Sequence, residues 1–157
     1  MSKLVFPIII FVLAAFFIYR TWTNHKASEA NFKLGQNFLI QNEQRAGVKT
    51  TESGLQYEVI TTGNGESHPT ATSQVKVHYH GTLLDGTVFD SSVDRGEPIS
   101  FPLNKVIQGW QEGVQLMVVG DKFRFYIPSN LAYGKNGSGP IPPAATLIFE
   151  VELLAIN

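Results

Sequence analysis

Six aromatic side chains in the second half of the sequence are the residues whose types suggest a binding pocket. They are Tyr79, Phe89, Phe101, Trp110, Tyr133 and Phe149. Aromatic rings fill cores in most proteins, and their spacing alone does not separate a core from a pocket. Tyr79 and Tyr133 also carry hydroxyls that need hydrogen-bond partners if they are buried. We therefore favour the hypothesis of an aromatic pocket with a few polar groups.

The charged and nucleophilic residues form a poor catalytic set. Their order and spacing match no Ser-His-Asp arrangement, no paired carboxylates and no HExxH-type metal motif. Cysteine is absent, which excludes a thiol nucleophile, a disulfide framework and a cysteine-based zinc site. His78 and His80 would share one face of a strand, and a solvent-facing strand explains them better than half of a metal site. We expect no metal and no cofactor.

The elements that must position these side chains are predicted from periodicity. Alternating apolar and polar residues predict strands at 55–59, 75–79, 122–127 and 146–154. Asp85-Gly86 predicts a tight hairpin turn with positive φ. Residues 109–117 predict one short helix with Trp110 on its apolar face. The predicted class is α+β, with an antiparallel sheet wrapped around one short helix.

The N-terminal segment from Leu4 to Tyr19 contains no charged residue. A helix over this run would be about 24 Å long, and Trp22 and its neighbours can extend it toward the roughly 30 Å hydrocarbon core. Tyr19, Arg20 and Trp22 suit the headgroup region. The alternatives are a cleaved signal peptide and a buried core helix. An uncleaved signal-anchor is favoured, because no small-x-small pair follows the run and no polar stripe interrupts it.

Residues 26–46 predict an amphipathic linker helix that stops at Gly47. Its apolar positions recur about every four residues, at Ala30, Leu34, Phe38 and Leu39. A spacer that packs on the domain is favoured over a dimerisation seam, and a homodimer stays open because the segment is short. The predicted organisation is a transmembrane signal-anchor at 1–24, a helical linker at 25–50 and a globular domain at 51–157.

The charge balance bears on partners and on orientation. With 12 Lys and Arg against 13 Asp and Glu, the chain lacks the basic surface that nucleic-acid binding needs, so nucleic acid is not an expected partner. Lys3 precedes the apolar segment, whereas Arg20, Lys26 and Lys33 follow it. The positive-inside tendency therefore points weakly to a cytoplasmic C-terminal domain.

Four sequence blocks resemble successive signatures of the FKBP-type peptidyl-prolyl cis-trans isomerases. In the order and spacing typical of the family, they are VHYHGTLLDGTVFDSSVDRGEPISF, VIQGWQEGVQLMVVGDKFRFYIP, LAYG and IPPAATLIFEVELL. The preceding GVKTTESGLQYEVI resembles the bacterial Mip/FkpA-like subgroup, whose members carry a helical extension and commonly work in the periplasm. The resemblance implies isomerisation of X-Pro bonds in unfolded or proline-containing polypeptides. Together with the apolar N-terminal segment, it predicts a single-pass protein of the inner (cytoplasmic) membrane with a periplasmic domain, in conflict with the charge distribution.

The same resemblance implies the residues that carry the activity. Asp90 would pair with Arg95 and hydrogen-bond Tyr79 at the rim of the pocket. The Ile107 N–H and the Tyr133 hydroxyl would hold the substrate backbone. The implied catalytic residues are therefore Tyr79, Asp90, Ile107 and Tyr133.

The implied substrate-binding residues surround a bound proline ring. Trp110 would form the floor, and Ile141 would close the pocket from a loop. The full set is Phe89, Arg95, Phe101, Val106, Trp110, Ile141 and Phe149.

The sequence departs from the family pattern at three places. Ile99 stands where several members have phenylalanine, and Pro140 stands where an aliphatic residue often closes the pocket. The loop at 135–140 is a residue shorter than in some relatives. Since these changes touch the rim, we expect them to alter substrate preference and inhibitor affinity more than activity.

Overall fold

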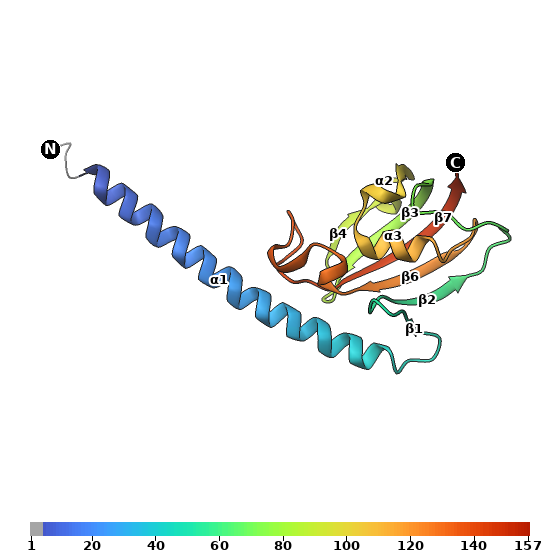
Figure 1. The fold of residues 1–157 in the computed structure, drawn as a ribbon, viewed down its shortest axis with the longest axis horizontal. Coiled ribbons are helices and arrows are strands. Elements are labelled where there is room, and N and C mark those ends of the chain that lie inside the picture. Colours follow the sequence, from blue (N-terminus) through green and yellow to red (C-terminus); the bar gives the residue numbers. More distant parts are fainter. Residues whose placement is uncertain (1–4) are drawn as a thin grey trace.

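The computed structural model describes residues 5–157, in which one long helix leads into a sheet domain (Figure 1). The helix α1 runs from Val5 to Asn42 without interruption. The predicted anchor and linker helices are thus one element, and it ends before the predicted stop at Gly47. The sequence has no proline or glycine between Pro7 and Gly35 that could break the helix. The Thr21 hydroxyl is satisfied within the helix, where it donates to the Phe17 carbonyl at 2.8 Å. Lys3 and the start of the apolar segment lie outside the described residues.

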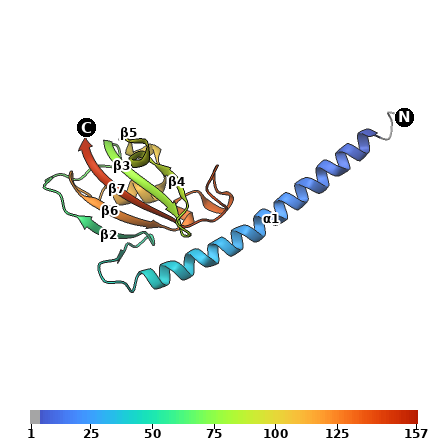
Figure 2. The same ribbon diagram turned by 180° about the vertical axis from the view of Figure 1, so that it is seen from behind.

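The domain is a single antiparallel sheet with short helical pieces between its strands. Along the main path the strands follow the order β1-β2-β6-β7-β3-β4, and β5 pairs with β3 beyond this path (Figure 2). The strand bounds are β1 Lys49–Thr50, β2 Gln56–Thr61, β3 Gln74–Leu83, β4 Val88–Ser91, β5 Ile99–Pro102, β6 Lys122–Ile127 and β7 Leu147–Ile156. The helices are α2 Ser92–Arg95 and α3 Gln108–Val114, with 3-10 turns η1 Leu103–Lys105, η2 Ser129–Leu131 and η3 Gly134–Asn136.

The predicted α+β class is confirmed, and α3 is the short helix that the sheet covers (Figure 1). The predicted hairpin turn is also confirmed. Gly86 has a φ of 88°, and the Leu83 N–H donates to the Thr87 carbonyl at 2.9 Å across the turn. The 88–102 region, for which no element was predicted, supplies β4, α2 and β5.

Close contact between α3 and β6 depends on two glycines of the helix. A Cβ on Gly109 would overlap Ile127, and one on Gly113 would overlap the ring of Phe125. Both partners are completely buried, as is Val114 at the end of α3. The helix backbone therefore lies directly on the sheet, which fixes the position of every side chain that α3 carries.

The C-terminal half of α1 packs on the domain through small and polar residues. Gly35 is buried against Thr146, and a Cβ on Gly35 would overlap the threonine hydroxyl. Asn31 Nδ2 donates to the Pro143 carbonyl at 2.8 Å. The predicted apolar stripe is wrong in part, because Leu39 is buried whereas Leu34 is 62% exposed. The face of α1 that contacts the domain is therefore defined by the close approach at Gly35 and the hydrogen bond of Asn31 as well as by the buried Leu39.

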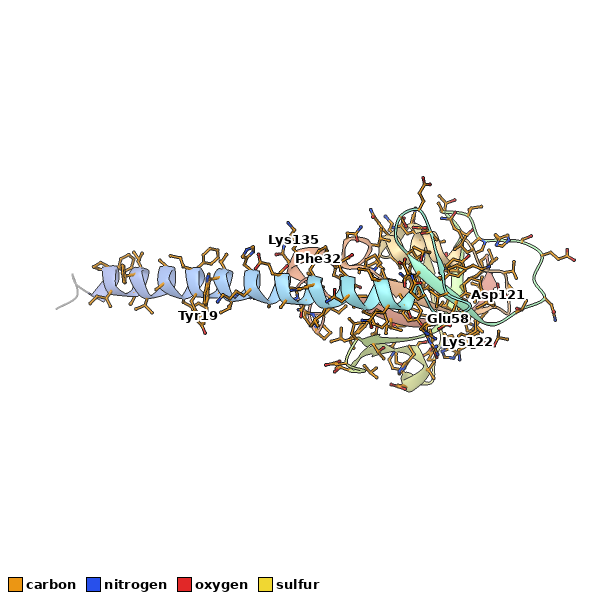
Figure 3. All side chains as sticks on the ribbon, turned by 90° about the horizontal axis from the view of Figure 1, so that it is seen from below. Tyr19, Phe32, Glu58, Asp121, Lys122 and Lys135 are labelled. Carbon is orange, nitrogen blue, oxygen red and sulfur yellow. The ribbon has the colours of Figure 1, made fainter. Side chains whose placement is uncertain are left out.

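The end of α1 is held by a polar network. Asn42 is buried and donates to Gln56 Oε1 at 2.9 Å, while Gln56 Nε2 donates to the Leu39 carbonyl at 2.9 Å. Just beyond the helix, Arg45 donates to the Tyr126 hydroxyl at 3.0 Å. Arg45 also lies 3.6 Å from Glu58, which is labelled in Figure 3. The direction of α1 relative to the sheet is therefore set by side chains of β2 and β6.

On the outer face of the sheet, Arg124 of β6 joins three strands. It donates to Glu58 Oε1 of β2 at 3.0 Å and to Glu150 of β7. Burial alone would raise the pKa of Glu58, but hydrogen bonds from Tyr126 and Arg124 outweigh it and hold this pKa below its ordinary value. The network ties the strand next to α1 to the middle of the sheet.

Replacing Gly35 by leucine should push α1 away from the domain without disturbing the core. Overpacking of this kind costs about 1–3 kcal/mol, and we expect faster proteolysis in the turn at residues 43–48. Limited proteolysis and thermal unfolding would measure this. Asn37→Leu, an exposed substitution on the same helix, is the matched control, and equal behaviour of the two variants would contradict the described packing.

Candidate functional site

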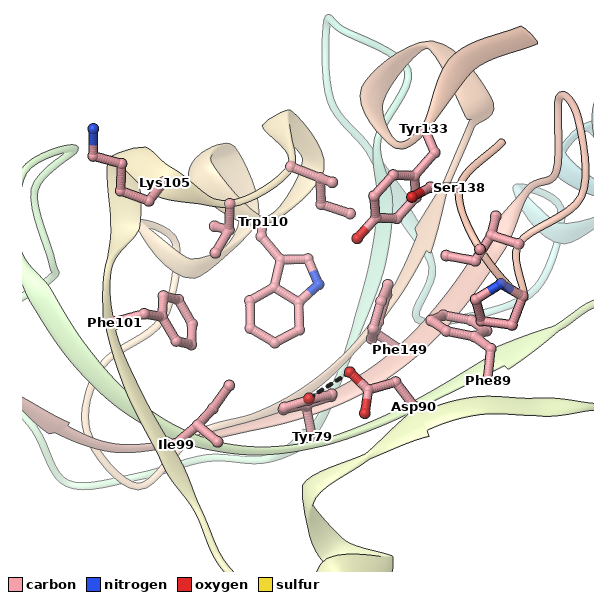
Figure 4. A pocket seen from close by; sticks show the side chains of 15 residues that line it. Tyr79, Phe89, Asp90, Ile99, Phe101, Lys105, Trp110, Tyr133, Ser138 and Phe149 are labelled. Carbon is pink, nitrogen blue, oxygen red and sulfur yellow. Dashed lines mark hydrogen bonds between the residues drawn. The ribbon is translucent and has the colours of Figure 1, made fainter. Parts of the chain in front are cut away.

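A cavity of about 480 Å³ opens between α3, the end of the β3–β7 pair and the loop that follows Tyr133 (Figure 4). Ten of the eleven residues predicted for the site line it; Arg95 does not. The lining comprises Tyr79, Phe89, Asp90, Ile99, Phe101, Lys105, Val106, Ile107, Trp110, Tyr133, Ser138, Gly139, Pro140, Ile141 and Phe149.

The floor of the cavity is the indole of Trp110, in the first turn of α3. The residue is 5% exposed and makes T-shaped contacts with Tyr79 at 5.4 Å and with Phe149 at 5.2 Å between ring centroids. Phe101 of β5 packs beside it at 5.6 Å. Within residues 5–157 the indole N–H has no conventional hydrogen-bond partner, and T-shaped geometry is the arrangement in which such a group lies against a ring face.

Gly81 keeps one wall of the cavity in place. It lies opposite Phe149 in the β3–β7 ladder, and a Cβ there would come within 2.7 Å of both the Phe149 and the Phe89 rings. Those two rings meet edge to face at 5.3 Å. Gly81 is not among the residues predicted for the site, although a glycine inside a strand is a known signal of close approach.

Tyr79, Asp90 and Arg95 form a closed triangle at the rim. The Tyr79 hydroxyl donates to Asp90 Oδ2 at 2.6 Å (Figure 4). Arg95 donates to Asp90 Oδ1 at 2.5 Å and to the Tyr79 hydroxyl oxygen at 3.0 Å. Arg95 does not line the cavity, so it acts on the site through its hydrogen bonds to Asp90 and to the Tyr79 hydroxyl.

The triangle shifts the pKa of its members in opposite directions. Burial would raise the pKa of Asp90, but hydrogen bonds from Tyr79 and Arg95 outweigh it and hold this pKa below its ordinary value. Burial, and then the hydrogen bond to Asp90, raise the pKa of the Tyr79 phenol. At neutral pH the site therefore presents a neutral phenol, a carboxylate and a guanidinium with little net charge.

Two further residues of the lining, Ile107 and Tyr133, carry groups that can donate hydrogen bonds. Ile107 immediately precedes α3, so its N–H lies outside the hydrogen bonds of that helix. Tyr133 is 41% exposed, and its hydroxyl points into the cavity (Figure 4). Both groups lie within the lining of a largely apolar space.

The rim is completed by loops whose position the sequence did not reveal. Ile141 is 7% exposed and is fixed by two hydrogen bonds with Ser138, of 2.9 and 3.0 Å. Pro140 is exposed at the same lip, and Ile99 of β5 lies half-buried at the other end. Lys105, which was not predicted, adds an exposed cation to the rim.

His78 and His80 project from β3 on the face away from the cavity. His78 Nδ1 lies 2.9 Å from Ser92 Oγ, and His80 Nδ1 lies 2.8 Å from Ser91 Oγ. Within residues 5–157 no three His, Asp or Glu side chains converge as metal ligands do. The polar groups of the cavity are therefore hydrogen-bonding groups around aromatic rings.

A sheet that wraps one helix and holds an aromatic cavity with a polar rim defines an α+β domain with a pocket suited to an apolar group. Residues 65–154 match the family model of the FKBP-type peptidyl-prolyl cis-trans isomerases, and residues 12–59 match that of the domain amino terminal to FKBP-type peptidyl-prolyl isomerase. The chain belongs to the FKBP-type peptidyl-prolyl cis-trans isomerase family.

Named relatives agree with this assignment. The chain is 62% identical over 132 residues to the isomerase FkpA of Aeromonas hydrophila, covering 84% of this chain and 49% of that protein. It is 56% identical over 123 residues to the 22 kDa FKBP-type isomerase of Escherichia coli, covering 78% and 59%. The crystal structure of FkpA from Escherichia coli matches with a TM-score of 0.93 at 38% identity, covering all of this chain and 73% of that one. The chain spans about half the length of the curated relatives it matches.

Acidification should weaken the Asp90 contacts through the carboxylate itself. Because the folded-state pKa lies below the ordinary value of about 3.9, the contribution of Asp90 to stability is fully present above that value. It is lost as the pH falls through the lowered pKa. The difference in unfolding midpoint between the wild type and Asp90→Asn should therefore be constant from about pH 5 to 7 and should shrink below about pH 4. A pH-independent difference in thermal unfolding would contradict this.

Proposed function

We propose that this chain is a peptidyl-prolyl cis-trans isomerase that accelerates X-Pro isomerisation during protein folding. The observation that carries the proposal is the indole of Trp110 at the base of an aromatic cavity whose rim carries the Tyr79–Asp90–Arg95 triangle. A proline ring is an apolar group that fits such a floor, and the polar groups lie where the flanking backbone of a polypeptide would pass.

The reaction suits a site without a nucleophile. Isomerisation must cross a barrier of about 18–20 kcal/mol that arises from amide resonance. Twisting the bond removes the resonance and makes the amide less polar, so an aromatic cavity that excludes water favours the twisted form over the planar one. A donor that engages the substrate only in the twisted geometry lowers the barrier selectively.

The proposed roles follow the positions of the groups. Tyr79, Asp90, Ile107 and Tyr133 are the catalytic residues, with the Ile107 N–H and the Tyr133 hydroxyl as donors to the substrate backbone. Arg95 acts by pairing with Asp90. The substrate-binding residues that touch the proline and its neighbours are Phe89, Phe101, Val106, Trp110, Ile141 and Phe149.

The three departures from the family pattern concern the edge of the cavity. Ile99 and Pro140 both lie in the lining, at the end next to β5 and at the loop lip respectively. A smaller side chain at 99 leaves more room beside the floor than phenylalanine would. We infer that they affect which residues next to proline are accepted and leave the floor unchanged.

The proposal is tested by measuring prolyl isomerisation in a protease-coupled or NMR exchange assay on the full chain in detergent. The double variant Tyr79→Phe, Asp90→Ala should lose about tenfold or more in kcat/KM, since each lost hydrogen bond contributes about 1 kcal/mol or more. The matched control Tyr57→Phe, Glu152→Ala changes the same kinds of group outside the lining and should keep the wild-type rate.

Absence of acceleration by a folded wild-type chain would contradict isomerase activity. In that case the same cavity would act as a binding module or chaperone that holds unfolded polypeptides. Binding of a proline-containing peptide without catalysis would identify this alternative.

We further propose that α1 anchors the chain in the inner (cytoplasmic) membrane as a single span, with the isomerase domain in the periplasm. The segment Phe6–Asn42 is long and apolar enough to cross a membrane, with a mean hydropathy of 1.7 in its most apolar window and none of that window buried. Phe11 and Phe17 are 77% and 69% exposed, a surface that suits lipid. The periplasmic side is inferred from the bacterial relatives, against the weak charge tendency.

Membrane anchoring predicts that the full-length protein stays in the pellet when membranes are washed with alkaline carbonate. A variant with Ile9, Val12 and Phe16 each changed to lysine should appear in the supernatant, because each charge near the centre of a span costs about 2.5–3.5 kcal/mol. Release of the wild-type protein would exclude the anchor. Protease protection in spheroplasts would then assign the side of an anchored domain.

A homodimer through α1 stays a prediction. Phe32, Leu34 and Ile40 are exposed apolar residues of the part of α1 beside the domain (Figure 3 labels Phe32). At about 100° per residue they point to three different sides of the helix, so they do not form one seam.

A further inference from the structure

The four-residue helix α2, Ser92–Arg95, contacts both the backbone and the hydroxyl of Tyr79. Arg95, in the last position of this helix, donates to the phenol oxygen at 3.0 Å. Ser92, in the first position, contacts the backbone of the same tyrosine: the Tyr79 N–H donates to Ser92 Oγ at 2.8 Å, and Ser92 Oγ lies 3.3 Å from the Tyr79 carbonyl oxygen. Ser92 is completely buried.

A gap in the sheet explains why a side chain is needed there. On the edge of β3 away from β7, β5 pairs as far as Val77 and β4 pairs from His80 onward. The backbone N–H and C=O of Tyr79 therefore face the space between these two strands. Buried backbone groups without hydrogen-bond partners destabilise the folded state. Ser92 Oγ takes the position of the missing strand.

The geometry of α2 links the two contacts. Ser91 caps the helix by accepting the Asp94 N–H at 3.1 Å, and Gly96 ends it with a φ of 74°. The helix is a single turn between these caps, so it has little freedom to change the separation between Ser92 and Arg95. Fixing Ser92 on the backbone of Tyr79 thus fixes the backbone position from which the Arg95 side chain reaches the phenol.

We propose that Ser92 is a positioning residue for the Tyr79 hydroxyl and its pairing with Asp90 and Arg95. It acts by replacing a strand at the backbone of Tyr79 and does not touch the cavity, whose lining does not include it. The effect on activity rests on the isomerase function proposed above, whereas the effect on Tyr79 does not.

His78 completes this arrangement on the outer face, where its Nδ1 lies 2.9 Å from Ser92 Oγ. The serine has one hydroxyl proton, which goes either to a neutral His78 Nδ1 or to the Tyr79 carbonyl. A protonated His78 donates to Ser92 Oγ and leaves the serine proton for the carbonyl. In both arrangements Ser92 Oγ stays between His78 Nδ1 and the backbone of Tyr79.

The test is Ser92→Ala in the full chain, read by two independent measurements. Titration of Tyr79, isolated by subtracting a Tyr79→Phe spectrum, should show a pKa that differs from the wild-type one. Because Arg95 lowers this pKa and Asp90 raises it, loss of the Arg95 contact would raise the pKa further and loss of the Asp90 contact would move it toward the ordinary tyrosine value. In the isomerase assay kcat should fall about fivefold, as expected for one hydrogen bond of about 1 kcal/mol, with KM changed less than twofold.

Ser73→Ala is the matched control, because Ser73 Oγ also accepts a backbone N–H, from Thr70 at 2.8 Å, outside the cavity lining. It should leave both the Tyr79 titration and kcat at wild-type values. If Ser92→Ala does not fold, Ser92→Cys is measured in the same way, since a thiol is close in size and a weaker hydrogen-bond partner.

Lower stability of a folded Ser92 variant with an unchanged Tyr79 titration would overturn the proposal and leave Ser92 a purely structural residue. A shifted titration in a chain that shows no isomerase activity would support the positioning role while contradicting the proposed function. The positioning role of Ser92 and the proposed isomerase function can therefore be contradicted independently.

Discussion

The pairing of β3 with β7 is the constraint on which the rest of the structure depends. It sets Tyr79 opposite Val151 and Gly81 opposite Phe149, so the residues of the cavity wall share the inner face. The residues between them point outward, where His80 lies opposite Glu150. A slip of one residue would exchange the two faces, placing charged groups in the core and aromatic rings in solvent. The register is therefore the shared origin of core, cavity and outer charge network.

The cavity is continuous with the core, and this couples its shape to the packing of the domain. Tyr79, Trp110 and Phe149 belong to the buried core cluster and also line the cavity. Trp110 is placed by a helix whose backbone touches β6 through Gly109 and Gly113. A change in volume behind the helix therefore moves the floor, since close-packed interiors transmit displacement. The polar rim is less coupled, because Asp90 and Arg95 are about half exposed.

Some parts of the fold and of the site could be predicted from the sequence and others could not, for physical reasons. Period-two alternation and the Asp85-Gly86 turn predict the strands and the hairpin, because both are local signals. The cavity residues came mainly from family resemblance, since aromatic spacing alone does not separate a pocket from a core. The face of α1 that packs on the domain was predicted only in part: Leu39 is buried as expected, whereas Leu34 is exposed and the close contact at Gly35 carries no hydrophobic signal. The role of Ser92 depends on where two strands stop along a third, which no local pattern encodes.

The absence of a break in α1 has a mechanical consequence. A helix of 38 residues is about 57 Å long, and the proposed membrane span would take roughly 30 Å of it. The remainder is a stiff stalk, clamped to the domain by Asn31, Gly35 and Asn42. Within residues 5–157 the stalk has no hinge, so in the proposed anchoring the tilt of the helix in the bilayer would determine the height of the domain and the direction in which the mouth of the cavity faces. Clients would be sampled from a thin layer above the lipid surface.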